Sequence, residues 1–147
     1  METEKTSLEN SENHIAEHIF RIEGTHWKEN CLPSLNDVLA EATKHPKAYW
    51  RLKTSMEQVV ISAIRHDLCG YKPSKRVSLD IVWGEKNKGT KRDFDNITGG
   101  GKKIINDALV KSGVIKDDNP KFLLPSKDSF VYTNEPYIEV RIVEEDL

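Results

Sequence analysis

The chain has 147 residues, of which 37% are hydrophobic and 31% are charged, and its formal net charge is −2 at pH 7. These values predict one soluble globular domain that is large enough for a proper core. No apolar run is long enough to span a membrane, and the polar, acidic N-terminus does not resemble a signal or transit peptide.

The nearly neutral total conceals a basic middle segment. Residues 44–103 carry 14 Lys and Arg against 6 Asp and Glu, whereas the segments on both sides are acidic. A charge run is usually a solvated surface, but beside an acidic site it favours polyanion binding. Cys31 and Cys69 lack the spacing of a zinc site, and we interpret them as buried thiols in a reducing cytoplasm.

The N-terminal third begins with a polar segment. Residues 1–13 lack hydrophobic periodicity, so we expect a disordered acidic tail there and a folded domain over residues 14–147. Alternating apolar residues predict a first strand over residues 15–23, which ends at Gly24.

Two helices are predicted next. The first opens at Pro33 and Ser34 and runs to about Thr43, with Ser34 as its N-cap and an acidic residue three positions later. Apolar residues spaced by three and four predict a longer helix over residues 48–68, with Met56 in its core stripe and Gly70 closing it.

The second half contains three strands and one helix. Their expected positions are a strand over 77–83, a helix from 96 or 98 to 112, and strands near 122–132 and 137–143. A basic loop over residues 85–91 follows the first of these strands. The order of elements predicts one α+β domain, in which helices flank a small mixed sheet.

Asp93-Phe94-Asp95-Asn96 is the first part of a candidate metal site. If this segment is extended, both carboxylates lie on one face, while Phe94 points into the core. Crowded carboxylates repel one another unless a cation lies among them. The alternative is that these residues are ordinary caps where a loop enters a helix.

Asp117 and Asp118 supply a third carboxylate if the chain folds back after the helix. Several Asp without nearby His or Cys suit Mg²⁺ and argue against zinc. Together with a lysine, such a site can hydrolyse a phosphodiester. Lys103 suits the charge-stabilising role, although its spacing fits a simple ion pair with Asp107 equally well.

Gly99-Gly100-Gly101 does not match a nucleotide-binding loop. The glycines either bend the chain and delay the helix start, or bring backbone amides close to a phosphate. We favour the bend.

Taken together, these motifs resemble the RusA family of Holliday junction resolvases. The matching pieces are Arg92-Asp93-x-Asp95-Asn96, Lys103 four residues before Asp107-Ala108-Leu109, and Gly113-Val114-Ile115-x-Asp117-Asp118. Pro33-Ser34-Leu35-Asn36 is similar to a further element of the family, so the resemblance extends over most of the chain.

The resemblance implies a homodimeric, Mg²⁺-dependent endonuclease, for which Mn²⁺ can substitute. Such enzymes are often encoded by phages and prophages. They cut four-way and other branched DNA in recombination and repair, in the cytoplasm of a bacterial or phage-infected cell. A two-fold dimer presents two equivalent sites to a four-way junction.

The resemblance also implies roles for individual residues. Asp93, Asp95 and Asp118 correspond to the metal-binding and catalytic acids, with Asp117 adjacent to them. The interval from Asn96 to the lysine is about four residues longer than in the family. Alignment from Asp107 assigns Lys103 as the catalytic or phosphate-contacting lysine, with Lys102 as the alternative.

DNA recognition would depend mainly on backbone and shape. The expected contacts come from Lys72, Lys75, Arg76, Lys86, Lys88, Lys91, Arg92 and Lys102. Two other functions stay open: a protein of the same fold that binds branched DNA without cutting it, and a metal-dependent nuclease that acts on other DNA structures.

Overall fold

Four strands form one mixed sheet in the computed structural model, which describes residues 17–145. The sheet order is β1-β4-β2-β3, in which β2 and β3 are parallel and the other neighbours are antiparallel. The strands are β1 (His18–Glu23), β2 (Val77–Lys86), β3 (Lys127–Thr133) and β4 (Tyr137–Glu144). The tail predicted for residues 1–13 lies outside the described residues.

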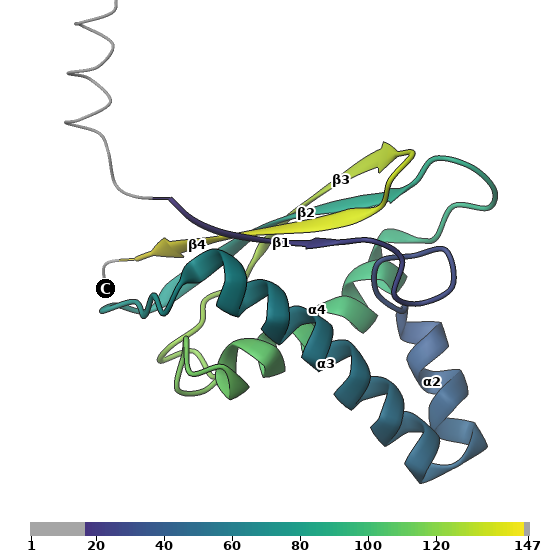
Figure 1. The fold of residues 1–147 in the computed structure, drawn as a ribbon, viewed down its shortest axis with the longest axis horizontal. Coiled ribbons are helices and arrows are strands. Elements are labelled where there is room, and N and C mark those ends of the chain that lie inside the picture. Colours follow the sequence, from purple (N-terminus) through teal and green to yellow (C-terminus); the bar gives the residue numbers. More distant parts are fainter. Residues whose placement is uncertain (1–16, 146–147) are drawn as a thin grey trace, which may run out of the picture.

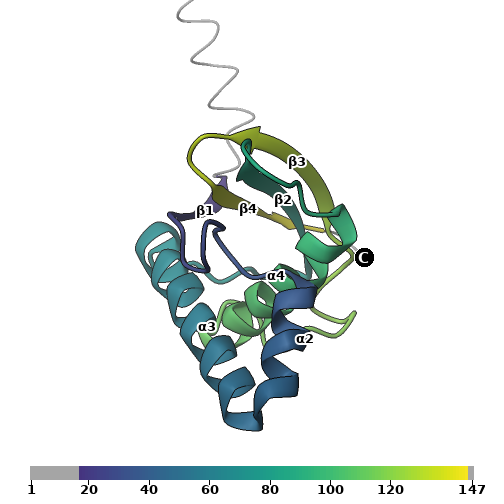
Figure 2. The same ribbon diagram turned by 90° about the vertical axis from the view of Figure 1, so that its right-hand side faces the viewer.

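Three helices cover one face of this sheet, and within residues 17–145 no other element covers the opposite face (Figures 1 and 2). They are α2 (Leu35–Lys44), α3 (Pro46–Leu68) and α4 (Phe94–Lys111). Alternate strand residues point toward the helices and form the core, among them Phe20, Ile22, Leu79, Ile81, Trp83 and Val140, each at most 1% exposed. Each such side chain contributes roughly 1.5–3 kcal/mol by its burial. The predicted α+β domain with a mixed sheet is confirmed.

Polar pairs occupy the uncovered face of the sheet. Arg141 lies 2.7 Å from Asp80 on the neighbouring strand, and Arg21 lies 3.5 Å from Glu139. This alternation of apolar and charged positions is the pattern that predicted β2 and β4 from the sequence. Within residues 17–145, no helix combines the length and the apolar character that crossing a membrane requires.

Helices α2 and α3 follow their local sequence signals. The Ser34 side chain accepts a hydrogen bond from the Asp37 amide, and the Asp37 carboxylate accepts one from the Ser34 amide, so the predicted capping box is confirmed. Pro46 stands in the first turn of α3 and starts that helix two residues before the predicted position. Cys31 is buried as predicted, whereas Cys69, which ends α3, is exposed.

Helix α4 differs from the expectation, because it continues unbroken through the three glycines. A Cβ at Gly100 would lie 2.4 Å from the Pro33 carbonyl oxygen, and one at Gly101 would lie 2.5 Å from the Trp83 ring. The glycines therefore let α4 pack closely against the start of α2 and against β2. This packing outweighs their cost in a helix, which is about 1 kcal/mol each, so the predicted bend is wrong.

Two strand boundaries also differ. Strand β2 continues to Lys86, because its pairing with β3 extends as far as Thr133. The strand predicted near residues 122–132 begins only at Lys127. Before it, the chain makes an isolated bridge, in which the Val77 amide donates to the Phe122 carbonyl at 3.0 Å.

Candidate active site along helix α4

Asp93 and Asp95 lie at the N-terminal end of α4, where both are exposed. The segment is not extended, because the Ile97 amide already donates to the Asp93 carbonyl at 3.0 Å and so begins the helix. The Asp93 side chain makes no capping hydrogen bond. Phe94 is 52% exposed and stacks on Phe130, with ring centroids 4.1 Å apart. The predictions of an extended segment and of a core position for Phe94 are therefore wrong.

The start of α2 meets the start of α4 at this point. The Asn36 amide donates to the Asn96 side-chain oxygen at 2.9 Å, which joins two motifs that lie 60 residues apart. Leu35 and Asn36 line a shallow hollow together with residues 93–96. Two helix N-termini converge on the hollow, and their partial positive charge favours a phosphate. The two carboxylates beside them favour a cation.

Arg92 holds the segment before Asp93 in place. Its Nε and Nη2 atoms each donate to the carboxylate of Glu85 at 2.8 Å, and Nη1 donates to the Leu32 carbonyl at 3.1 Å. Glu85 is only 6% exposed. Because these bonds use the guanidinium inside the protein, Arg92 has a positioning role, and contact with DNA does not follow from its charge.

Glu85 was missed by the sequence analysis, which placed it in a loop. The inward alternation of Leu79, Ile81 and Trp83 continues to Glu85, so the strand pattern already contained the signal. A charged residue at an inward position requires a buried partner, and Arg92 provides it.

Lys103 joins α4 to the loop that follows it. Its Nζ atom lies 3.2 Å from Asp107 and 3.4 Å from Asp118, and its side chain is 61% exposed. The chain thus folds back after α4, as the sequence analysis required, and the ion pair with Asp107 is confirmed. The Asp107 carboxylate also lies 2.8 Å from the Nζ atom of Lys53 on α3.

These contacts fix the charges of the group. The hydrogen bond to Asp107 raises the pKa of Lys103 above its ordinary value. Burial acts to raise the pKa of Asp107, but hydrogen bonds from Lys53 and Lys103 outweigh it and hold that pKa below its ordinary value. Both side chains are therefore charged at neutral pH.

Lys102 points elsewhere, toward the sheet. Its Nζ atom lies 2.5 Å from Asp128 of β3, and Asp128 also accepts a hydrogen bond from the Trp83 indole at 3.0 Å. Of the two candidate lysines, Lys103 is the one that reaches Asp118. The sequence carried no signal for Asp128, because its partners lie far from it along the chain.

The four candidate acids form two pairs. Lys103, which contacts Asp118, is about 12 Å along the α4 axis from Asp95 at 1.5 Å per residue. Across the part of the chain that the structure describes, no three His, Cys, Asp or Glu side chains are grouped closely enough to hold a metal. Mg²⁺, however, commonly takes one or two carboxylates together with waters and substrate phosphates, and the exposed oxygens of Asp93 and Asp95 fit that donor set.

The second acidic pair is organised by its own loop. The Asp118 amide and the Asn119 side chain donate to Asp117, at 2.7 and 3.0 Å, and these bonds lower the pKa of Asp117. Asp117 is therefore charged at neutral pH. Its carboxylate fixes the turn that directs Asp118 toward Lys103.

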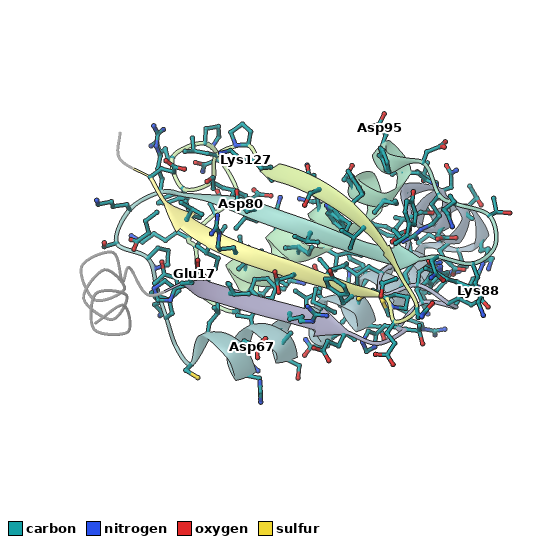
Figure 3. The ribbon with its side chains drawn as sticks, turned by 90° about the horizontal axis from the view of Figure 1, so that it is seen from above. Glu17, Asp67, Asp80, Lys88, Asp95 and Lys127 are labelled. Atoms are coloured by element: carbon teal, nitrogen blue, oxygen red, sulfur yellow. The ribbon has the colours of Figure 1, made fainter. Side chains whose placement is uncertain are left out.

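Six of the basic residues predicted to bind DNA lie in two patches at opposite ends of β2, whereas Lys102 pairs with Asp128 instead. Lys86, Lys88, Lys91 and Arg92 line a pocket of about 300 Å³ with Tyr132, and Lys91 lies 4.7 Å above the Tyr132 ring. Two of these cations are paired within the pocket, Lys86 with Glu29 and Arg92 with Glu85. Figure 3 shows Lys88 and Asp95 toward the same end of the sheet. Lys75 and Arg76 precede β2 at its other end, roughly 30 Å away at about 3.3 Å per strand residue.

Comparison with known protein families and curated proteins identifies no relative of this chain. A scan against models of protein families finds no match, and a search of the curated proteins finds no match either.

Proposed function

We propose that this protein is a Mg²⁺-dependent, structure-selective endonuclease that cuts branched DNA, with the four-way junction as its main substrate. The observation that carries the proposal is the arrangement along α4. Exposed Asp93 and Asp95 lie at its N-terminus, and Lys103 lies about two turns further on beside Asp118. Carboxylate oxygens for a hard cation and an ammonium group for phosphate are the chemistry of phosphodiester hydrolysis.

Each side chain then has a definite task. Asp93 and Asp95 would hold the metal, which when bound activates water and neutralises charge on the phosphate. Lys103 would stabilise negative charge on the phosphate oxygens, since Asp107 keeps it protonated. Asp107, which also pairs with Lys53, holds that ammonium in place. Gly99 is exposed midway between Asp95 and Lys103 and has no side chain to block an approaching strand.

A four-way junction is large enough to use both basic patches. Salt dependence would follow from the number of phosphates that their Lys and Arg side chains contact. We further propose a homodimer, because two symmetric nicks in opposing strands need two equivalent sites.

The test is cleavage of a synthetic four-way junction with each strand labelled in turn. Wild type should produce paired nicks in opposing strands when Mg²⁺ is added, and no nicks in EDTA. Asp93→Asn should abolish cleavage while retaining junction binding. Glu135→Gln, an exposed change in the turn between β3 and β4, is the matched control. Equal cleavage by wild type and Asp93→Asn would refute the assigned site.

A second candidate is a protein that binds branched DNA without cutting it. The observation in its favour is the separation of the four acids into two pairs. Tight junction binding in Ca²⁺, with no nicking in Mg²⁺ or Mn²⁺, would select it. Flap and linear duplex substrates in the same assay distinguish a nuclease that acts on other DNA structures.

A further inference from the structure

A pocket of about 470 Å³ lies at the C-terminal end of α4, away from Asp93 and Asp95. Its walls come from the connection between α3 and β2 and from the loop that leads to Asp117, which lie at one end of the sheet in Figure 1. Part of the wall is apolar: Val114 and Ile115 are 7% and 6% exposed, and Pro73 and Phe122 lie beside them. The volume is within the range of small-ligand sites.

The polar part of the same pocket is strongly basic. Its cationic side chains are Lys75, Arg76, Lys116 and Lys121. The only acidic residue in the lining is Glu145, whose carboxylate accepts a hydrogen bond from the Ser78 hydroxyl at 2.9 Å. An excess of positive charge around a concave surface raises the local concentration of anions.

Three of these cations differ from the lysines of α4 in having no ion-pair partner among the described residues. Among residues 17–145, no ion pair involves Arg76, Lys116 or Lys121, whereas Lys102 and Lys103 each contact a carboxylate. The Arg76 Nε atom is moreover buried without an acceptor among the described residues. Buried donors are normally satisfied, so Arg76, which lines the pocket, retains an unused donor within the part of the chain that the structure describes.

We propose that this pocket binds one unpaired nucleotide of a DNA strand. The phosphate would lie against Arg76, Lys116 and Lys121, and the base would pack on Phe122 and the apolar wall. A simple anion would use only the cations, whereas the aromatic and apolar surface matches the flat face of a base. The proposal deepens the proposed nuclease function and rests on it. Because Lys116 directly precedes Asp117 and Asp118, a strand held here is directed toward Lys103.

The first experiment compares ligands in EDTA, where the proposed nuclease cannot cut. A fluorescently labelled short oligothymidylate is bound to the full chain and followed by polarisation. We expect the oligothymidylate to bind more tightly than a duplex of the same length. Thymidine 5′-monophosphate should compete for it more effectively than inorganic phosphate. Equal competition by the monophosphate and phosphate would reduce the pocket to an anion site and overturn the proposal.

The second experiment separates phosphate contacts from base contacts. The double variant Lys116→Ala/Lys121→Ala should weaken oligothymidylate binding by about tenfold or more. It should also reduce the slope of log affinity against log salt by about 0.7, which is the contribution of the one phosphate that both lysines contact on a single strand. Phe122→Leu keeps an apolar side chain but removes the aromatic ring, and it should weaken binding by about tenfold with an unchanged salt slope.

The control is Lys47→Ala/Arg51→Ala, which removes two exposed charges from α3. Its affinity should stay within about twofold of wild type. A loss as large as that of Lys116→Ala/Lys121→Ala would show general charge attraction and overturn the proposal.

The result is separable from the nuclease test. Asp93→Asn should stop junction cleavage and leave the competition by thymidine 5′-monophosphate unchanged. If wild type fails to cut the junction, the proposed nuclease function is contradicted. The comparison of thymidine 5′-monophosphate with phosphate would still test whether the pocket binds a nucleotide.

Discussion

Lys103 reaches Asp118, which lies 15 residues further along the chain, with 3.4 Å between Nζ and Oδ2. The contact brings the loop after α4 back alongside the helix. It places a protonated amine beside the second acidic pair, at the surface, where a phosphate could displace the carboxylate. The Lys103 amine also pairs with Asp107, and Asp107 in turn pairs with Lys53 of the neighbouring helix α3.

The two adjacent lysines should therefore have different effects on activity and stability. Lys103→Ala should reduce junction cleavage by more than about a hundredfold with little change in junction binding, because it removes charge stabilisation at the phosphate. Lys102→Ala should lower stability instead, by about 1 kcal/mol, because Asp128 loses its ion pair. Junction cleavage rates measure the effect of each variant on activity, and urea denaturation measures its effect on the free energy of unfolding. The reverse pattern would assign the catalytic role to Lys102.

Asp107→Asn should loosen the contact between α3 and α4. The amide cannot pair with Lys53 and Lys103 together, so we expect a loss of about 1–2 kcal/mol in the free energy of unfolding. Urea denaturation checks the value. Glu41→Gln, which removes an ion pair with the exposed Lys44 on α2, is the control and should cost less than about 0.5 kcal/mol.

The same group predicts how stability depends on pH. Asp107 has a lowered pKa, so its contribution is present above its ordinary value of 3.8 and is lost as pH falls through the lower, folded-state value. Lys103 has a raised pKa, so its contribution is present below its ordinary value of 10.5 and is lost as pH rises through the higher, folded-state value. The free energy of unfolding, measured from acidic to alkaline pH, should depend less on pH at both ends of the range in Asp107→Asn than in wild type. Identical profiles for the variant and wild type would contradict these pKa shifts.

Two of the glycines of α4, Gly99 and Gly100, should respond differently to alanine. Gly100→Ala should destabilise the protein by at least about 2 kcal/mol, because its Cβ meets the backbone of Pro33 and Ser34 at 2.4 Å. Gly99→Ala places its Cβ 3.2 Å from Leu35 Cβ and Cδ2, so Leu35 at the start of α2 needs to shift by only a few tenths of an ångström. That variant should be neutral or more stable by up to about 1 kcal/mol. Thermal unfolding of the pair decides between packing and simple helix propensity.

Arg92→Lys should be a destabilising substitution. Lysine cannot reproduce the two hydrogen bonds to Glu85, so we expect a loss of about 2–4 kcal/mol. Because Arg92 acts inside the protein, the salt slope of junction binding should stay the same. Lys88→Ala should leave stability unchanged and lower that slope by about 0.9. A lower slope in an Arg92 variant that remains folded would show direct DNA contact.

Much of the fold follows from local patterns. The alternation in β2 and β4, the apolar stripe of α3 and the capping box at Ser34 are properties of neighbouring residues, and each predicted its element. The predicted strand boundaries were wrong where pairing with a distant strand determines them. Strand β2 continues to Lys86 because β3 lies beside it, and no residue near Lys86 signals this.

The candidate site divides in the same way. The sequence by itself determined which carboxylates and lysines are available, and its spacing determined the ion pair between Lys103 and Asp107. Only the tertiary structure decided that α4 begins at Phe94, that Arg92 binds a buried Glu85, and that Lys102 and Lys103 point to different partners. Each of these depends on contacts between residues distant in sequence, such as the close approach of Gly100 to Pro33. Such contacts outweigh local propensities of about 1 kcal/mol, because they determine which groups are buried and which find a partner.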